Sequence, residues 1–281
     1  MGARCGADTV LRALNPKKSH KSRFAQVECR AAGVRMEGSS KFGESFYAPP
    51  DAFEGAGVSI SGPEAKHITV VLRRRPGDVL HVVDGEGARH AVELVECTPG
   101  RVTGEIRSTE RVEAPVPELW VAAGLIRATR MDDLVEKCAE LGARAVVPLL
   151  TSRSLSAKGV SAARLDRWRR IAAGAMTQSS RLFLPRVEDP LPVESLARLA
   201  GEDSAFVVAD PSGGSLLALT LEGLKKKRLV ACVGPEGGFT PEEVLRLMAL
   251  PGARVSLGRA RLRTETAAAV LVDRLSFLLG L

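Results

Sequence analysis

From residue 119 onward, short apolar runs alternate with longer segments of helical periodicity, and this alternation constrains the fold more than any other feature of the chain. The apolar runs are typical of strands that are buried on both faces. They cover residues 119–124, 145–150, 205–209, 229–233 and 254–257. Helical periodicity predicts helices over residues 132–141, 161–176 and 264–279. Strands that alternate with helices indicate an α/β domain with a mostly parallel sheet over residues 119–281.

One more helix in this region is predicted from its capping residues. Thr240 is a preferred N-cap, Pro241 suits the first turn, and Glu243 completes a capping box. We therefore expect a helix to begin at Thr240, directly after the glycine-rich segment 234–238.

Residues 45–111 have a different pattern, with short alternating segments between turn signals. Strands are predicted over residues 58–60, 78–83, 90–96 and 101–106, separated by Gly and Pro at 76–77, 85–87 and 99–100. This spacing predicts a small β-barrel. Residues 112–118 contain Pro115 and Pro117, which resist helix and central strand, so we expect a linker there.

Residues 1–44 show no sustained hydrophobic period and are rich in Arg, Lys, Ser, Ala and Gly. Residues 1–45 hold nine Lys or Arg and four Asp or Glu, so they carry +5 of the formal net charge of +7. With no apolar signal-peptide core, the composition favours a disordered organellar transit peptide, for the chloroplast rather than the mitochondrion. The alternatives are a basic tail that binds RNA or a start further along, at Met36. Without a transit peptide the expected compartment is the cytoplasm.

Composition argues against several classes of site. The five cysteines are scattered and none lies at metal-ligand spacing, so we expect neither a metal site nor a disulfide framework. No apolar run approaches the ~20 residues that span a bilayer, so no membrane partner is expected.

Two loops each follow a predicted strand, where open parallel sheets bind ligands. The first is Gly234-Pro-Glu-Gly-Gly238, whose glycines permit close backbone approach to a ligand; a tight strand-to-helix turn explains them equally well. The second covers residues 257–266 and carries three arginines, which suit a phosphate or carboxylate. Glu265 is placed to pair with one of them. Taken alone, a solvated basic loop explains the second segment better.

Six ordered motifs together are more specific than either loop. They are Gly234-Pro-Glu-Gly-Gly-Phe-Thr-Pro-Glu-Glu, Leu257-Gly-Arg-Ala-Arg-Leu-Arg-Thr-Glu-Thr-Ala, Glu136-Lys-Cys-Ala-Glu-Leu-Gly, Ser152-Arg-Ser, Arg167-Trp with Ala175-Met-Thr-Gln-Ser-Ser-Arg and Pro185, and His67-Ile-Thr-Val-Val-Leu-Arg with Gly77-Asp78 and Asp84-Gly85. With them the chain resembles, over residues 44–281, the RsmE-type methyltransferases. Members of that family methylate N3 of a uracil in small-subunit (16S-type) ribosomal RNA.

The resemblance implies a SPOUT-type α/β methyltransferase domain with a deep trefoil knot, preceded by a PUA-like β-barrel. It implies S-adenosylmethionine as methyl donor, a homodimer, and small-subunit ribosomal RNA, within an assembled subunit, as partner. The cofactor residues it implies are Ala209, Gly234, Pro235, Glu236, Gly237, Gly238, Leu257, Gly258, Leu262, Arg263, Thr264 and Thr266.

The resemblance also supplies candidates for RNA binding and catalysis. The RNA-binding candidates are His67, Arg73, Arg74, Arg75, Arg127 and Arg130. Arg181 is the candidate for stabilising negative charge on the base, with the capping of helix carbonyls as its alternative. Glu236 is the candidate for accepting a proton or hydrogen bond, with a turn acceptor as an equally weighted alternative.

One segment departs from the family pattern. Ile126, Arg127 and Ala128 stand where the family has Pro-Lys-Gly, which puts the contact of this loop with RNA or a partner subunit in question. Two other functions stay open: a SPOUT methyltransferase with another RNA target, and a non-catalytic ribosome-assembly factor that binds RNA.

Overall fold

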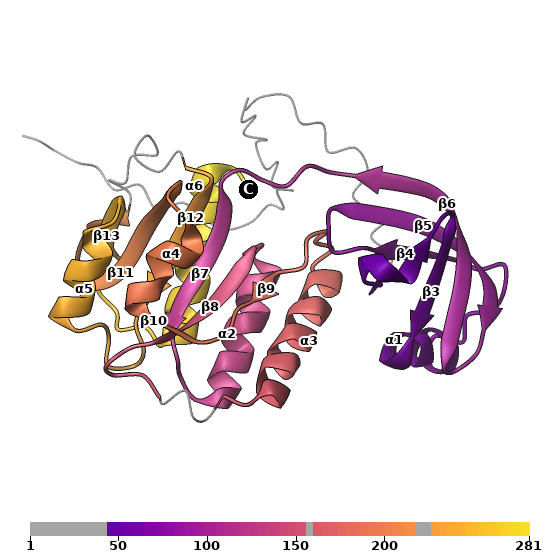
Figure 1. The fold of residues 1–281 in the computed structure, drawn as a ribbon, viewed down its shortest axis with the longest axis horizontal. Coiled ribbons are helices and arrows are strands. Elements are labelled where there is room, and N and C mark those ends of the chain that lie inside the picture. Colours follow the sequence, from indigo (N-terminus) through magenta and orange to yellow (C-terminus); the bar gives the residue numbers. More distant parts are fainter. Residues whose placement is uncertain (1–43, 156–159, 217–225) are drawn as a thin grey trace, which may run out of the picture. The chain divides into compact units, whose positions relative to one another are not determined.

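A computed structural model describes residues 44–155, 160–216 and 226–281, which form two separate β-sheets with associated helices (Figure 1). The predicted extension, residues 1–44, lies outside the described residues except for Glu44. Within the described part of the chain, no helix has the length and apolar character needed to cross a membrane.

The first sheet has six strands in the order β1-β4-β5-β6-β3-β2. Only β1 and β4 pair in parallel; the other neighbours are antiparallel. The strands are β1 (Ser45–Tyr47), β2 (Phe53–Glu54), β3 (Gly57–Ser61), β4 (Val79–Val83), β5 (Ala88–Cys97) and β6 (Arg101–Arg111). Three short helical segments accompany them, η1 (Pro50–Ala52), α1 (Gly62–Lys66) and η2 (His67–Val71). Alternate residues of the strands, among them Ile60, Val82 and Val92, enclose a hydrophobic core.

The second sheet is entirely parallel along the order β10-β8-β7-β12-β11-β13, with β9 paired to β8, and the predicted α/β class is confirmed. Its strands are β7 (Glu118–Gly124), β8 (Ala145–Leu150), β9 (Arg186–Val187), β10 (Leu191–Pro192), β11 (Ser204–Ser215), β12 (Arg228–Val233) and β13 (Gly252–Ser256). Glu118, expected in the linker, thus begins β7.

Helices cover both faces of this sheet (Figure 1). One core contains side chains of α2 (Ala128–Glu140), α3 (Ala162–Gln178) and α6 (Thr264–Leu279). The opposite core contains side chains of α4 (Leu196–Ala200) and α5 (Pro241–Met248). The short segment η4 (Val193–Ser195) directly precedes α4. The period of two along β7 explains this division, because Leu119 and Val121 belong to the first core and Trp120 to the second.

Several predicted boundaries can be compared with the structure. Thr240 caps α5 through a complete capping box with Glu243, and α6 has the predicted bounds. By contrast, α2 starts at Ala128 rather than residue 132, and Ile126 is buried in the first core. The residues that replace Pro-Lys-Gly therefore supply a core side chain and the first turn of a helix.

Candidate functional site

A cavity of about 570 Å³ lies where the central parallel strands end, and we call it the carboxyl-edge cavity. Two loops meet there, following β12 and β13, together with residues 209–211 of β11 and Arg153 from the segment after β8. Residues far apart in sequence line one space because parallel strands end at one edge of a sheet. The lining residues from the predicted cofactor set are Ala209, Gly234, Pro235, Glu236, Gly237, Gly238, Leu257, Gly258, Leu262 and Thr264.

The loop after β12 needs its glycines for steric reasons. A Cβ atom on Gly234 would lie 2.7 Å from the backbone nitrogen of Phe239, closer than real contacts allow. Gly238 has a φ of +71° and its N–H donates to the carbonyl oxygen of Pro235 at 2.8 Å, closing a tight turn. The turn explanation is thus confirmed, and it is compatible with the ligand explanation, because the same turn forms one wall of the cavity.

Arg153 and Glu243 hold this loop from outside. Arg153 Nη1 donates to the carbonyl oxygen of Gly237 at 2.7 Å. The Glu243 carboxylate, almost fully buried, accepts from Ser152 N at 2.7 Å and from Thr240 N at 2.8 Å. One side chain thus caps α5 and fixes the segment after β8. The sequence gives no role for Arg153 of the Ser152-Arg-Ser motif, because a contact to a backbone oxygen leaves no periodic signal.

The loop after β13 is joined to the loop after β12. The buried Thr264 hydroxyl donates to the carbonyl oxygen of Gly234 at 3.1 Å, and Arg261 Nη2 donates to that of Glu236 at 3.2 Å. Arg263 and Thr266, both predicted to bind the cofactor, are exposed and do not line the cavity. Glu265 makes no ion pair with any described residue, and its Oε2 is buried without a hydrogen-bond partner.

Of the two catalytic candidates, only Glu236 reaches the carboxyl-edge cavity. Its carboxylate lies 3.4 Å from Arg130 Nη1, so the two side chains form an ion pair at the cavity. Arg181 lies elsewhere: its Nε donates to the carbonyl oxygen of Glu140 at 3.2 Å, at the end of α2, and its guanidinium packs beside Gly142. This position matches the alternative role, the capping of helix carbonyls.

The other RNA-binding candidates lie apart from the cavity. His67 Nε2 is 3.3 Å from a Glu44 carboxylate oxygen, and the His67 ring contacts Phe46 edge-on. The three exposed arginines at positions 73–75 follow η2, with Arg73 at a φ of +55°. Arg127 is exposed at the N-cap of α2.

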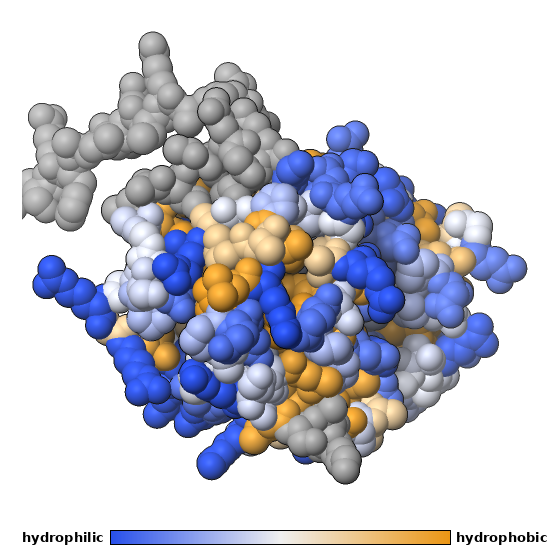
Figure 2. Space-filling model, turned by 60° about the vertical axis from the view of Figure 1, so that its left-hand side comes forward, coloured by the Kyte–Doolittle hydropathy of each residue, from blue (hydrophilic) through white to orange (hydrophobic). Residues whose placement is uncertain are grey.

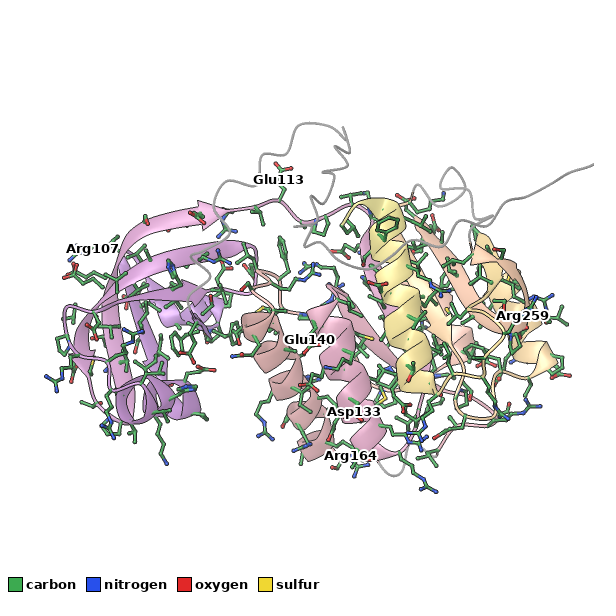
Figure 3. All side chains as sticks on the ribbon, turned by 180° about the vertical axis from the view of Figure 1, so that it is seen from behind. Arg107, Glu113, Asp133, Glu140, Arg164 and Arg259 are labelled. Carbon is green, nitrogen blue, oxygen red and sulfur yellow. The ribbon has the colours of Figure 1, made fainter. Side chains whose placement is uncertain are left out.

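The surface around the cavity mixes charged and apolar side chains. Figure 2 brings forward the side of the molecule that carries α5 and β13, and blue and orange residues alternate across it. Arg259, labelled in Figure 3, is exposed on the loop after β13 and lines the cavity. The chemistry this lining supports is the binding of an amphiphilic, partly charged small molecule.

Comparisons with known proteins agree with this geometry. Residues 112–276 match the model of a family described as RNA methyltransferase domain. A ribosomal RNA small subunit methyltransferase E from Synechocystis is 31% identical over 88% of this chain and 82% of its own length. The protein of the same name from Bacillus subtilis is 31% identical over 80% of this chain and 91% of its own length.

One solved structure resembles this chain in its three-dimensional fold. A ribosomal RNA small subunit methyltransferase E from Neisseria gonorrhoeae, bound to S-adenosyl methionine, has a TM-score of 0.73 and 26% identity, covering 84% of this chain and 97% of that one. The predicted resemblance is therefore confirmed, and the chain belongs to the ribosomal RNA small subunit methyltransferase E family.

Proposed function

We propose that this protein uses S-adenosylmethionine to methylate N3 of a specific uridine in small-subunit ribosomal RNA during ribosome maturation. The observation that carries the proposal is one cavity formed by the loops after β12 and β13 together with residues 209–211 of β11. Its sequence relatives are named as small-subunit ribosomal RNA methyltransferases, and a solved relative holds S-adenosylmethionine.

The residues present fit this methyl donor. The volume of about 570 Å³ is in the range of small-molecule sites. Leu257, Leu262 and Ala267 provide apolar contact for a purine, while the backbone of the loop after β12 provides donors and acceptors. Asp210 and Glu236 add carboxylates to the lining for hydroxyl groups or for positive charge on the donor.

The bound donor supplies an electrophilic methyl group on a sulfonium sulfur, and the chain's residues orient the reaction. The uracil N3 must lose its proton as it attacks the methyl carbon. Glu236, paired with Arg130 at the cavity, is the residue we propose to accept that proton or a hydrogen bond from the base. Because Arg181 lies outside the cavity, we propose that it contacts RNA and not the donor.

Two features of the fold are also proposed, a PUA-like barrel and a knot. We infer that the first sheet is a PUA-like barrel that contacts RNA phosphates through arginines 73–75. The C-terminal domain is inferred to be knotted as in SPOUT enzymes. In support, the chain leaves β13 at the sheet edge and returns to α6, which packs on β7 and β12 in the middle of the sheet.

Assembly and location also remain proposals. A homodimer would cover Phe277, which is 85% exposed on α6. Residues 1–44 are proposed as a chloroplast transit peptide on their composition. Fusion of this segment to a fluorescent protein tests the location, and cytoplasmic fluorescence would contradict it.

The central experiment uses the full chain, labelled S-adenosylmethionine and small ribosomal subunits from a strain that lacks this methylation. We expect one methyl group per subunit, on N3 of one uridine. Because N3 methylation blocks base pairing, reverse transcription will stop beside that nucleotide, and mass spectrometry will identify the modified base. Methylation of a ribose or of another RNA would support a different SPOUT target, and donor binding without any transfer would support an assembly factor.

A further inference from the structure

A second cavity, of about 410 Å³, lies within the first sheet, and the proposed function gives it no role. We call it the N-terminal cavity. Segments η1, β2, β5 and β6 contribute to its lining, which includes Phe53, Asp84, Glu86, His90, Thr109 and Arg111. All these residues belong to the region 50–111, so the cavity is separate from the carboxyl-edge cavity.

Strand register shows that a polar residue, His90, occupies an inward position here. Along β5, Ala88, Val92 and Leu94 are buried on the core side, and His90 shares that face with 8% exposure. Thr109 lies opposite His90 on β6, and its Oγ1 is 2.9 Å from His90 Nδ1. An apolar residue would be buried at lower cost at this position. A histidine on the core face of a strand therefore indicates a polar partner inside the cavity.

His90 has one ring nitrogen available for that partner. Nδ1 is occupied by Thr109, while Nε2 has no hydrogen bond to any residue that the structure describes. Burial lowers the pKa of His90, so the imidazole is neutral near pH 7 and offers one donor or acceptor.

Asp84 and Arg111, two other charged residues of the cavity, are paired with each other. Asp84 Oδ1 accepts from the backbone N–H of Glu86 at 2.7 Å and of Ala88 at 2.9 Å, and Oδ2 is 3.1 Å from Arg111 Nη2. The two carboxylates, Asp84 and Glu86, would repel a phosphate group. A neutral ligand fits this lining better than an anion.

One wall of the cavity is aromatic. The rings of Phe53 and His90 have centroids 4.7 Å apart and are inclined by 42°, so they present a joint surface and leave no space for a third ring between them. A flat, neutral ligand with hydrogen-bonding edges would stack on this surface and reach His90 Nε2. Nucleobases have this chemistry, and they stack on aromatic side chains in single-stranded RNA complexes.

We propose that the N-terminal cavity binds one unstacked nucleobase of the RNA substrate, distinct from the base that is methylated. The base stacks on the wall formed by Phe53 and His90 and hydrogen-bonds with His90 Nε2. This inference rests on the proposed function, since it takes RNA as the ligand.

The test compares full-length variants that keep the sheet folded. Phe53→Leu removes the ring but keeps apolar volume, and His90→Asn keeps a group that can contact Thr109 while removing Nε2. Leu80→Val is the matched control, because Leu80 is buried in the same core and does not line the cavity. The probe is the small ribosomal subunit from a strain that lacks this methylation, with affinity measured by cosedimentation at fixed salt.

We expect each cavity variant to lose about tenfold in RNA affinity, the loss of one base–aromatic stack, while Leu80→Val stays near wild type. Ultraviolet crosslinking followed by mass spectrometry should place a base on the peptide that contains Phe53. S-adenosylmethionine affinity should not change. A parallel titration with free adenosine, guanosine, cytidine and uridine separates a nucleoside site from an RNA site.

The outcomes separate this proposal from the proposed function. If wild type methylates the RNA but both cavity variants bind it as tightly as Leu80→Val, the nucleobase site is wrong and the enzyme assignment stands. Crosslinking of a free nucleoside with unchanged RNA affinity would also overturn the RNA site. If wild type neither binds nor methylates the RNA, the proposed function itself fails.

Discussion

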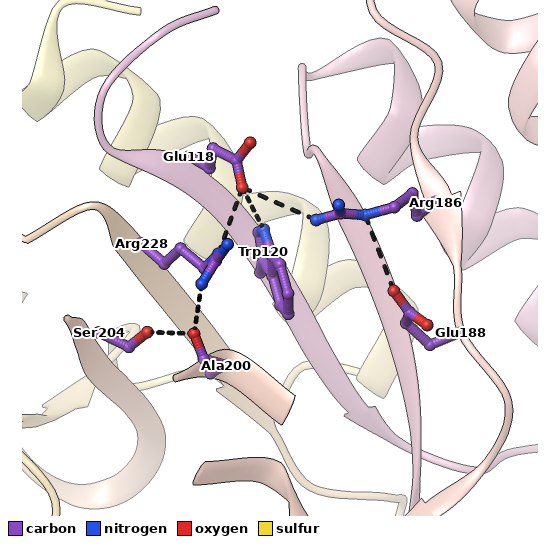
Figure 4. Close-up of polar contacts among 7 residues, drawn as sticks. All are labelled: Glu118, Trp120, Arg186, Glu188, Ala200, Ser204 and Arg228. Atoms are coloured by element: carbon purple, nitrogen blue, oxygen red, sulfur yellow. Dashed lines mark hydrogen bonds and ion pairs between the residues drawn. The ribbon is translucent and has the colours of Figure 1, made fainter. Parts of the chain in front are cut away.

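The two edges of the parallel sheet use arginine in different ways. At the edge where the strands begin, the Glu118 carboxylate lies between Arg228 and Arg186, at 3.4 and 3.7 Å, and accepts from Trp120 Nε1 at 3.1 Å (Figure 4). Both guanidinium groups lie over the Trp120 ring. The Cζ atom of Arg228 is 5.0 Å from the ring centroid, and that of Arg186 is 4.9 Å from it. We call these four residues the amino-edge cluster.

At the edge where the strands end, arginines contact loop backbone. Arg153 and Arg261 donate to carbonyl oxygens of the loop after β12, and the space beside them stays open as the carboxyl-edge cavity. The amino-edge arginines are engaged by a carboxylate and an indole within the chain. Arginines near a strand end therefore indicate a ligand site only where a cavity stays open beside them.

The largest expected effect is at the carboxyl edge. Gly234→Ala should weaken S-adenosylmethionine binding by at least about 100-fold, or roughly 2.7 kcal/mol, because the new Cβ would collide with the backbone of Phe239. Isothermal titration calorimetry measures the affinity. Gly174→Ala is the control, because a Cβ there meets no atom within 4 Å and α3 gains a better helix former. Equal affinity in both variants would contradict the steric account of the loop.

Arg153→Ala should have the next largest effect. Loss of its hydrogen bond to Gly237 removes one of the contacts that hold the loop after β12, so we expect roughly tenfold weaker binding of S-adenosylmethionine. The unfolding midpoint should change little, since the side chain lies at the surface. Arg164→Ala, at a half-buried position in the first turn of α3, should leave the affinity unchanged (Figure 3). A similar loss in both variants would mean that net charge, and not the loop contact, sets the affinity.

The amino-edge cluster should behave in the opposite manner. Glu118→Gln removes the charge shared by Arg186 and Arg228, and we expect about 1 kcal/mol less unfolding free energy in urea with unchanged donor affinity. Glu113→Gln, at an exposed position labelled in Figure 3, is the matched control. If Glu118→Gln instead weakened donor binding, the two edges would be coupled and the contrast between them would fail.

The smallest effect concerns pH and involves a residue of the first sheet, outside both edges of the parallel sheet. Burial lowers the pKa of His90, so the unfolded chain takes up a proton more readily than the folded one. The stability due to neutral His90 is present above the ordinary pKa of 6.5 and is lost as the pH falls through the folded-state value. His90→Asn should therefore show a shallower fall in melting temperature on acidification than wild type. Identical slopes would show that other groups control the acid response.

Local signals predicted the elements, and their tertiary contacts escaped prediction. Thr240 and Glu243 form the expected capping box because the contacts are three residues apart. Ala128 begins α2 earlier than predicted because buried Ile126 and Met131 hold the segment against the core. Hydrophobic burial of that kind depends on neighbours distant in sequence.

The residues of the site were likewise predicted only in part. Ordered motifs located the loops after β12 and β13, and ten of the predicted cofactor residues line the cavity. Arg181 was expected to act on the base, yet in the folded chain it reaches the end of α2. The sequence favoured the role on the base over carbonyl capping, because the capping partner, the Glu140 carbonyl, is a backbone group that every residue type provides. The contact of Arg153 escaped prediction for the same reason, because its partner is the backbone carbonyl of Gly237.

Glu243 has a consequence for the motions of the protein. Each oxygen of its carboxylate accepts one amide, Ser152 N from the segment after β8 and Thr240 N from the start of α5. Breaking this connection releases both segments together, so the protons of these two amides should exchange with solvent in a single opening event. The segment after β8 and the start of α5 would then open as one unit. A bound donor would slow the exchange of both amide protons by the same factor.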